Sequence, residues 1–278
     1  MQSVKARLIP FARRNGFENM AIDEYMISWH ERHRRPVLRV YGWEPSAISL
    51  GRYQRIDCLN REACSLHGVD VVRRITGGGA ICHDRELTYS LACDPAGLGR
   101  SFLSVRESFD SVNSVILEMY RMLGLNAAYA GTVRGASGPG QRADFCFSGK
   151  EEYDIVIRGM KIGGNAQRRT GSTIFQHGSI PLQFDADRIR DYFNTSIDTR
   201  NFTDLDAVSG KSNSAEDVAD ALIRVFIKAT GWSLAEEGIG AAEREEIIDI
   251  MNGKYLRSRW NYEGRADEYE VSQAGVAR

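Results

Sequence analysis

Cys146 has the setting in this 278-residue sequence that best suits covalent chemistry. It follows residues 131–142, a stretch with four glycines and one proline that we expect to be a loop, and it precedes a strand-like segment. A thiol at such a place can act as a nucleophile when a nearby cation stabilises its thiolate. A lone cysteine is more often a small buried hydrophobe. We interpret the other cysteines in that second way, because none follows a glycine-rich loop: Cys58, Cys64, Cys82 and Cys93.

Lys161 is the second candidate, because it follows a tight turn at 158–159 and precedes Gly163 and Gly164. A lysine beside a turn is usually solvated. Consecutive glycines weaken a strand, however, and indicate that another group approaches this backbone closely. The register of the expected hairpin does not bring Cys146 to Lys161, so a thiol–ammonium pair cannot be derived from spacing alone.

A run of three glycines, Gly77, Gly78 and Gly79, lies between two strand-like segments. It has neither the spacing nor the lysine of a P-loop, and it is not a GxGxxG motif. Glycines without Cβ atoms let backbone N–H groups approach an anion or a carbonyl closely. A plain flexible hairpin would give the same pattern, so both interpretations stay open.

His83 and His177 complete the set of chemically capable residues. Each lies on a strand-like segment, where a histidine with satisfied structural hydrogen bonds is the first interpretation. Their spacing from Cys146 does not identify a Cys–His pair.

Hydrophobic periodicity predicts the elements that must position these residues. We expect helices at 19–29, 60–66, 105–123, 186–193, 215–229 and 244–251, and strands at 37–43, 47–50, 69–74, 80–83, 88–93, 153–157, 160–167 and 173–182. The last three strands should form a meander. Antiparallel strands interleaved with amphipathic helices indicate an α+β fold rather than a doubly wound parallel sheet.

The length predicts one main domain at 1–210, with a helical C-terminal extension packed on it at 211–264 and a polar, disordered tail at 265–278. The chain ends soon after residue 262, which we expect to leave no room for a further accessory domain.

Composition excludes several classes of function. The 36 basic and 37 acidic residues give a net charge of −1, so no global field attracts nucleic acid or an anionic membrane. No stretch approaches the roughly 18 apolar residues of a membrane span, and the N-terminus lacks the apolar core of a signal peptide. The odd set of cysteines without CxxC spacing favours neither disulfides nor structural zinc, which indicates a reducing, cytoplasmic compartment. The basic run at 32–35 either closes a helix or docks an acidic partner.

The sequence resembles the lipoate–protein ligases and related protein acyltransferases. Residues 73–84, RRITGGGAICHD, resemble their RRxxGGGxxxHD signature, and residues 159–167, GMKIGGNAQ, resemble their GxKxxGxAQ segment with its functional lysine. Residues 176–180 match the HG segment that follows. The segment 16–24 resembles the early NMAxDE helix, and 254–262 resembles the late KY…WNY element. Gly163 replaces the serine or alanine that is common at its place.

This resemblance implies a biotin/lipoyl protein ligase-like fold with antiparallel and mixed sheets flanked by helices. It implies catalysis by Cys146 and Lys161, without a cofactor or a metal. The residues that it implies for substrate binding are Arg74, Gly77, Gly78, Gly79, His83, Gly163, Gly164, Asn165 and His177.

The resemblance leaves more than one activity open. Residues 143–156, with Cys146, resemble the cysteine-containing segment of the LipM-type octanoyltransferases. That group implies transfer of octanoate from acyl carrier protein to a lysine of a lipoyl domain, such as glycine cleavage H protein or a 2-oxoacid dehydrogenase E2. The alternatives are ATP-dependent lipoate ligation, octanoyl transfer between two lipoyl domains, and a module that only binds lipoyl domains.

Overall fold

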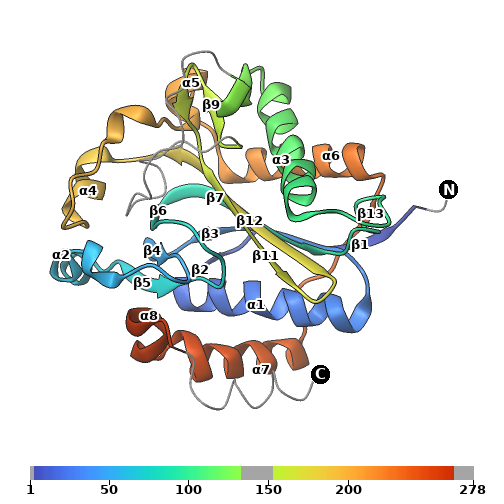
Figure 1. Ribbon diagram of the computed structural model, residues 1–278, viewed down its shortest axis with the longest axis horizontal. Coiled ribbons are helices and arrows are strands. Elements are labelled where there is room, and N and C mark those ends of the chain that lie inside the picture. The colour runs from blue at the N-terminus through green and yellow to red at the C-terminus, as the bar shows by residue number, and fades with distance from the viewer. Residues whose placement is uncertain (1–2, 133–152, 266–278) are drawn as a thin grey trace.

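The computed structural model describes residues 3–132 and 153–265. Their centre is a mixed sheet of seven strands, shown in Figure 1. Its order is β11 (Gly164–Thr170), β12 (Thr173–Gln183), β7 (Arg85–Cys93), β3 (Val37–Trp43), β1 (Lys5–Ile9) and β13 (Ser233–Glu236), with β2 (Arg13–Arg14) beside β3. The strands from β11 to β3 are antiparallel, whereas β1 pairs parallel with both β3 and β13.

Smaller sheets flank the central one. The first contains β5 (Asp70–Arg73), β4 (Ala47–Leu50) and β6 (Ile81–His83), and the second contains β10 (Met160–Lys161), β9 (Ile155–Ile157) and β8 (Ala127–Tyr129). The expectation of an α+β fold with antiparallel and mixed sheets is therefore confirmed.

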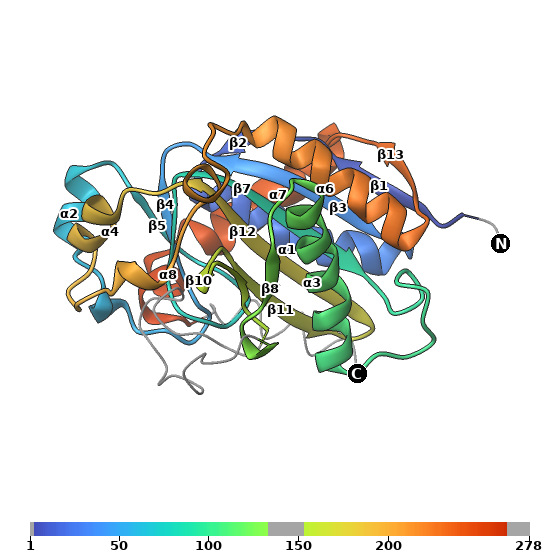
Figure 2. The ribbon, with the colours of Figure 1, turned by 90° about the horizontal axis from the view of Figure 1, so that it is seen from above.

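Helices cover both faces of the central sheet. On one face α3 (Val105–Met122) and α6 (Ala215–Thr230) lie side by side, as Figure 2 shows. On the other face α1 (Gly16–His33) packs on the strands, with α7 (Ala241–Ile250), the π-helical turn η4 (Met251–Tyr255) and α8 (Ser258–Glu263) below it in Figure 1. Short helices α2 (Arg61–Leu66), α4 (Ala186–Asp191) and α5 (Leu205–Ser209), with the 3-10 turns η1 (Ile56–Cys58), η2 (Ala130–Thr132) and η3 (Thr199–Asn201), join the strands.

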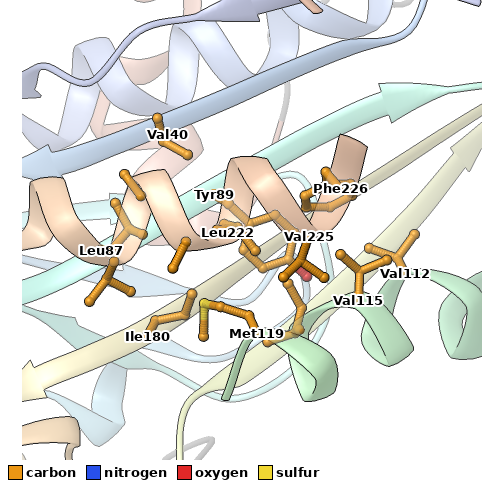
Figure 3. Close-up of a cluster of buried hydrophobic side chains, with 14 of the residues drawn as sticks. Val40, Leu87, Tyr89, Val112, Val115, Met119, Ile180, Leu222, Val225 and Phe226 are labelled. Atoms are coloured by element: carbon orange, nitrogen blue, oxygen red, sulfur yellow. The ribbon is translucent and has the colours of Figure 1, made fainter. Parts of the chain in front are cut away.

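The alternation of side chains along β7 decides what each face of the sheet contains. Leu87, Tyr89 and Leu91 point toward α3 and α6 and form the apolar core that Figure 3 shows. The residues between them, Thr88 and Ser90, point the other way, toward α1. The sheet therefore has one apolar face and one face with many polar side chains.

The apolar face also explains the helix expected at 105–123. Val112, Ile116 and Met119 are buried against the sheet, whereas Val105, at the first turn, is exposed. Ser104 caps this helix by a reciprocal hydrogen-bond pair with Glu107.

The expected three-stranded meander is wrong in one respect. Residues 160–167 do not form one strand, because the strand is interrupted between Lys161 and Gly164. Gly163 has a φ of +80°, and a Cβ atom there would lie 2.2 Å from the carbonyl oxygen of Ser179. The chain bends at this contact, so β10 pairs with β9 and β11 pairs with β12 in a different sheet.

The segment 211–264 is not a purely helical extension. Its strand β13 completes the central sheet beside β1, and the apolar side of α6 belongs to the main core. The indole N–H of Trp232 also donates to the carbonyl of Gly97 at 2.7 Å. A boundary at residue 210 therefore cuts through one packing unit. Apart from residue 265, the expected disordered tail at 265–278 lies outside the described residues.

The basic residues at 32–35 form contacts within the fold. Helix α1 ends at His33, and the neighbouring arginines pair with carboxylates of other elements: Arg32 with Glu246 at 2.9 Å, Arg34 with Asp94 at 3.3 Å and Arg35 with Glu237 at 2.9 Å. These contacts favour the helix-closing interpretation over a docking patch. No helix in the described ranges is long and apolar enough to cross a membrane.

Candidate functional site

Asp23, on α1, is the centre of the polar side of the central sheet and is only 1% exposed. It accepts hydrogen bonds from Arg39 at 2.9 Å, from Ser90 at 2.8 Å, from the Tyr41 hydroxyl at 2.9 Å and from Nδ1 of His177 at 3.1 Å. Burial alone would raise the pKa of Asp23, but the His177 hydrogen bond and the Arg39 charge hold it below its ordinary value. The carboxylate is therefore ionised and acts as an acceptor.

His177 connects this carboxylate to the triglycine run. Since its Nδ1 donates to Asp23, its Nε2 is the acceptor for the Thr76 hydroxyl at 2.7 Å. Burial lowers the pKa of His177, which keeps the imidazole neutral. Thr76 directly precedes Gly77, so this chain of hydrogen bonds fixes the run relative to α1.

Glu86 is the centre of a second cluster of buried hydrogen bonds. Its carboxylate accepts from Nδ1 of His83 at 2.8 Å, from the Trp43 indole at 3.1 Å, from Thr88, and from Ser179 at 2.6 Å. Nε2 of His83 is then the acceptor for the Ser49 hydroxyl at 2.7 Å. The ring of His83 also stacks on Trp43, with centroids 3.9 Å apart.

Arg74 shapes the triglycine run. Its guanidinium donates to the carbonyls of Gly77 and Gly79, both at 2.7 Å, and to the carbonyl of Ser49 at 2.8 Å. Gly78 has a φ of +95°, which explains why glycine is required there. Substrate binding by Arg74 and the three glycines stays a prediction.

A small cavity of about 20 Å³ brings several candidate residues together. Arg74, His83, Gly164 and His177 line it, and Gly77, Gly78, Gly79, Gly163 and Asn165 are not among its lining residues. Its apolar walls come from Met20, Trp43, Ile81 and Ala166, among others. The hydroxyls and imidazoles around it bond to Asp23, to Glu86 or to one another, so contact with a hydrocarbon group leaves them satisfied.

Gly163 and Asn165 support this cavity from outside. Asn165 accepts a hydrogen bond from the Tyr89 hydroxyl at 2.8 Å. A Cβ atom on the facing Gly178 would lie 2.0 Å from the Asn165 Oδ1 atom. The glycine of the HG segment is therefore required by close packing between β11 and β12.

Lys161 is only 2% exposed, so the expectation of a solvated lysine beside a turn is wrong. Its ammonium pairs with Asp154 at 2.8 Å, and its carbonyl accepts from the backbone N–H of Thr203. Lys161 does not line the cavity described above. Cys146 lies outside the described residues, so the proximity of Cys146 and Lys161 stays a prediction.

The late KY…WNY element holds the early motifs in place. Lys254 pairs with Glu24 of the NMAxDE helix at 2.9 Å. The backbone of Arg73 accepts from the Trp260 indole and donates to the Asn261 side chain, at 2.9 and 3.0 Å. These contacts explain why the sequence motifs occur together over such long separations.

Asp23, Glu86 and Asp154 are site residues that the sequence reasoning did not single out. Asp23 lies within the NMAxDE resemblance, and Glu86 follows His83 by three residues, so both positions carried a signal. Val156 on β9 faces Lys161 across the hairpin. Asp154 lies two residues before Val156, so both side chains point to the same side as Lys161. Within the described ranges, no group of three or more His, Cys, Asp or Glu side chains is arranged to hold a metal ion.

Comparisons with known proteins agree with this architecture. A family model described as the lipoyl protein ligase A/B catalytic domain matches residues 15–227. The octanoyltransferase LipM of Kyrpidia tusciae is 36% identical over 92% of this chain and 98% of its own, and that of Bacillus subtilis is 31% identical over 94% and 99%. A bipartite lipoate protein ligase from Thermoplasma acidophilum, described with its E2 lipoyl domain, shares the fold with a TM-score of 0.76 at 20% identity, over 95% of this chain and 99% of that one.

We expect Gly78→Val to abolish octanoyl transfer without unfolding the chain. A side chain there meets a disfavoured φ, and its Cβ would lie 2.9 Å from the Arg74 guanidinium, which displaces the triglycine run. Gly77→Ala is the matched control, because a Cβ there meets nothing within 4 Å. Transfer rates and near-UV circular dichroism check both variants. Full activity of Gly78→Val would show that the run is only a flexible turn.

We also expect stability to fall on acidification through the ordinary histidine pKa of 6.5. His177 resists protonation when folded but binds a proton when unfolded, so the free energy of unfolding falls below that pH, by up to about 1.4 kcal/mol per pH unit for one histidine. Urea unfolding from about pH 5.5 to 7.5 measures the slope. His177→Gln should flatten it, and equal slopes in the parent and this variant contradict the neutral imidazole.

Proposed function

The chain belongs to the lipoyl protein ligase A/B catalytic domain family and, within it, to the LipM octanoyltransferases, and from this premise we propose its reaction. It is an acyltransferase of lipoate biosynthesis. We propose that it takes octanoate from octanoyl-acyl carrier protein onto Cys146 as a thioester. It then passes the acyl group to one lysine of a lipoyl domain, on glycine cleavage H protein or a 2-oxoacid dehydrogenase E2.

The observation that carries this proposal is the cavity lined by Arg74, His83, Gly164 and His177. Segments that are distant in sequence meet there, and the hydroxyls and imidazoles around it are hydrogen-bonded to Asp23, to Glu86 or to one another. Its apolar walls favour an acyl chain, because burying hydrocarbon contributes roughly 0.8 kcal/mol per methylene group. At about 20 Å³ the cavity has to widen to admit eight carbons. The chemistry of the lining therefore supports acyl-chain binding at this cavity.

The first half of the reaction exchanges one thioester for another. The Cys146 thiolate attacks the carbonyl carbon of the octanoyl thioester, and the thiolate of the carrier arm leaves. The two thioesters have similar free energies, so the step needs no ATP. A cation beside Cys146 stabilises its thiolate, and we assign that role to Lys161. Asp154 holds the ammonium of Lys161 in position.

The cysteines in the described residues are poorly suited to this attack. Burial raises the pKa of Cys64 to about 11 and raises the pKa values of Cys82 and Cys93 as well. Cys58 is buried, and its thiol contacts the carbonyl of Arg55. A thiol that stays protonated is a weak nucleophile, which supports Cys146 as the site of the acyl group.

The second half forms an amide. The neutral amine of the acceptor lysine attacks the carbonyl carbon of the Cys146 thioester and becomes positively charged. The nitrogen then releases one proton to solvent, and the C–S bond breaks as the Cys146 thiolate leaves. The reaction runs downhill because an amide is more stable than a thioester. A lipoyl domain as acceptor is supported by the family and by the E2 lipoyl domain described with the Thermoplasma acidophilum ligase.

Removal of the Lys161 ammonium should affect both stability and reactivity. Lys161→Ala takes a donor from the buried side of Asp154, which we expect to cost about 1–3 kcal/mol of unfolding free energy. It should also slow acylation of Cys146 about tenfold or more, because the thiolate fraction falls tenfold for each unit by which the thiol pKa rises. Asp154→Asn should slow acylation less, since the cation stays.

Urea unfolding measures the first effect. The pH profile of iodoacetamide labelling at Cys146, read by mass spectrometry, measures the second. If the parent and Lys161→Ala have the same labelling profile, Lys161 has no electrostatic role toward the thiol.

The nucleophile is tested by intact mass after incubation with octanoyl-acyl carrier protein and no ATP. We expect one octanoyl adduct on the parent and none on Cys146→Ala, while variants of the other cysteines keep it. Cys146→Ser should form a slow, persistent ester, because esters undergo aminolysis more slowly than thioesters. Transfer by Cys146→Ala at the parental rate would disprove the covalent mechanism. A requirement for ATP and magnesium would favour the ligase alternative.

A further inference from the structure

A concave surface lies between η1 and α8, away from the cavity of the proposed active site. Its volume is about 390 Å³, and Arg52, Tyr53, Arg55, Arg73 and Tyr262 are among its lining residues. Tyr53 is 87% exposed, which is unusual for a large aromatic side chain. An exposed ring surrounded by arginines is typical of a surface that binds another molecule.

The carboxylates at this surface are already paired with neighbouring arginines. Asp57 contacts Arg55 at 2.5 Å, and Glu263 contacts Arg265 at 3.9 Å. The positive charges of Arg52, Arg61 and Arg73 are therefore not balanced by these acids. We call Arg52, Arg55, Arg61 and Arg73, with Tyr53 and Tyr262, the arginine face.

The contacts of the remaining arginines confirm this excess of positive charge. Arg52 donates to the carbonyl of Gly264 at 2.6 Å and lies over the Trp260 ring. Arg61 lies over the ring of Tyr262, with its guanidinium carbon 4.3 Å from the centroid. Neither forms an ion pair with a carboxylate in residues 3–132 and 153–265.

Arg73 adds a buried charge beneath the face. It is 1% exposed, and its guanidinium donates to carbonyls of residues 51, 52, 54, 260 and 261. Burial and the nearby charge of Arg52 both lower its pKa. Carbonyl oxygens satisfy the donors of Arg73 but do not cancel its charge, so the field reaches the surface above it.

The arginine face adjoins the triglycine run through the backbone. The N–H of Arg52 donates to the carbonyl of Thr76 at 2.8 Å. Beside it, a Cβ atom on Gly51 would lie 1.8 Å from the carbonyl oxygen of Gly78, so the two backbones touch. A partner bound on this face is therefore next to the triglycine run.

We propose that the arginine face docks the acyl donor, a carrier protein that presents its acyl group on a phosphopantetheine arm. This proposal rests on the proposed function. The arm carries a phosphodiester anion, which arginine binds well, whereas the acceptor protein presents a cationic lysine that this face repels. The chain as a whole has a net charge of −1, so the attraction is local to this surface.

The test compares two donors that carry the same thioester. Octanoyl-acyl carrier protein brings the protein and the phosphate, and octanoyl-pantetheine brings neither. We expect Arg55→Glu/Arg61→Glu, two exposed positions, to lower kcat/KM for the carrier protein about tenfold or more and to flatten its dependence on salt. The rate of Cys146 acylation by octanoyl-pantetheine, followed by intact mass, should not change.

Arg224→Glu/Lys228→Glu is the matched control. Both residues are exposed on α6, on the other side of the central sheet, and the change in charge is equal. It should leave both donors unaffected.

Other outcomes overturn the docking proposal. An unchanged kcat/KM for the carrier protein, or an equal loss with both donors, shows that the face does not recognise the donor. A defect confined to transfer from Cys146 to the lipoyl domain assigns the face to the acceptor instead. If the parent protein forms no adduct with either donor, the proposed function itself fails, which is a distinct result.

Discussion

A carboxylate that is sealed from water must receive hydrogen bonds from its surroundings, and Asp23 and Glu86 impose this requirement on the polar side of the central sheet. Their donors come from several elements: Arg39 and Tyr41 on β3, Ser90 on β7 and His177 on β12 bond to Asp23, and His83 on β6 bonds to Glu86. Each element must keep its place if both carboxylates are to stay satisfied. The cavity between them is therefore preformed, and its imidazoles are held in one tautomer.

The motifs of this family are paired contacts rather than independent sites. Lys254 meets Glu24, and Trp260 with Asn261 meets the backbone of Arg73. Gly178 makes room for Asn165. Most of the residues that the resemblance marks thus hold the cavity in shape, and a smaller set lines it. A motif read from sequence does not distinguish these roles, because both impose strict requirements on residue type.

Much of the fold could be predicted where the signal is local. The strands at Val37–Trp43 and Ala47–Leu50 and the helix that begins at Val105 follow from hydrophobic patterns that lie within a few residues. The pairing of β13 with β1 could not be predicted, since β13 is four residues long and mostly exposed. Burial of Lys161 was missed for a related reason, because the contacts that bury a side chain beside a turn come from distant segments. From the sequence, Gly163 was expected to weaken a strand. It is instead the bend at which the chain passes from one sheet to another.

The parallel pairing of β1 with β13 has a consequence for biosynthesis. Strand β1 begins at Lys5, and β13, which pairs with its outer edge, begins at Ser233. A ribosome therefore synthesises all the elements from β1 to α6 before β13 can cover the outer edge of β1, and α6, which closes the apolar face, emerges only shortly before β13. During translation the nascent chain exposes an open strand edge and an apolar surface together, the combination that chaperones bind and that promotes aggregation.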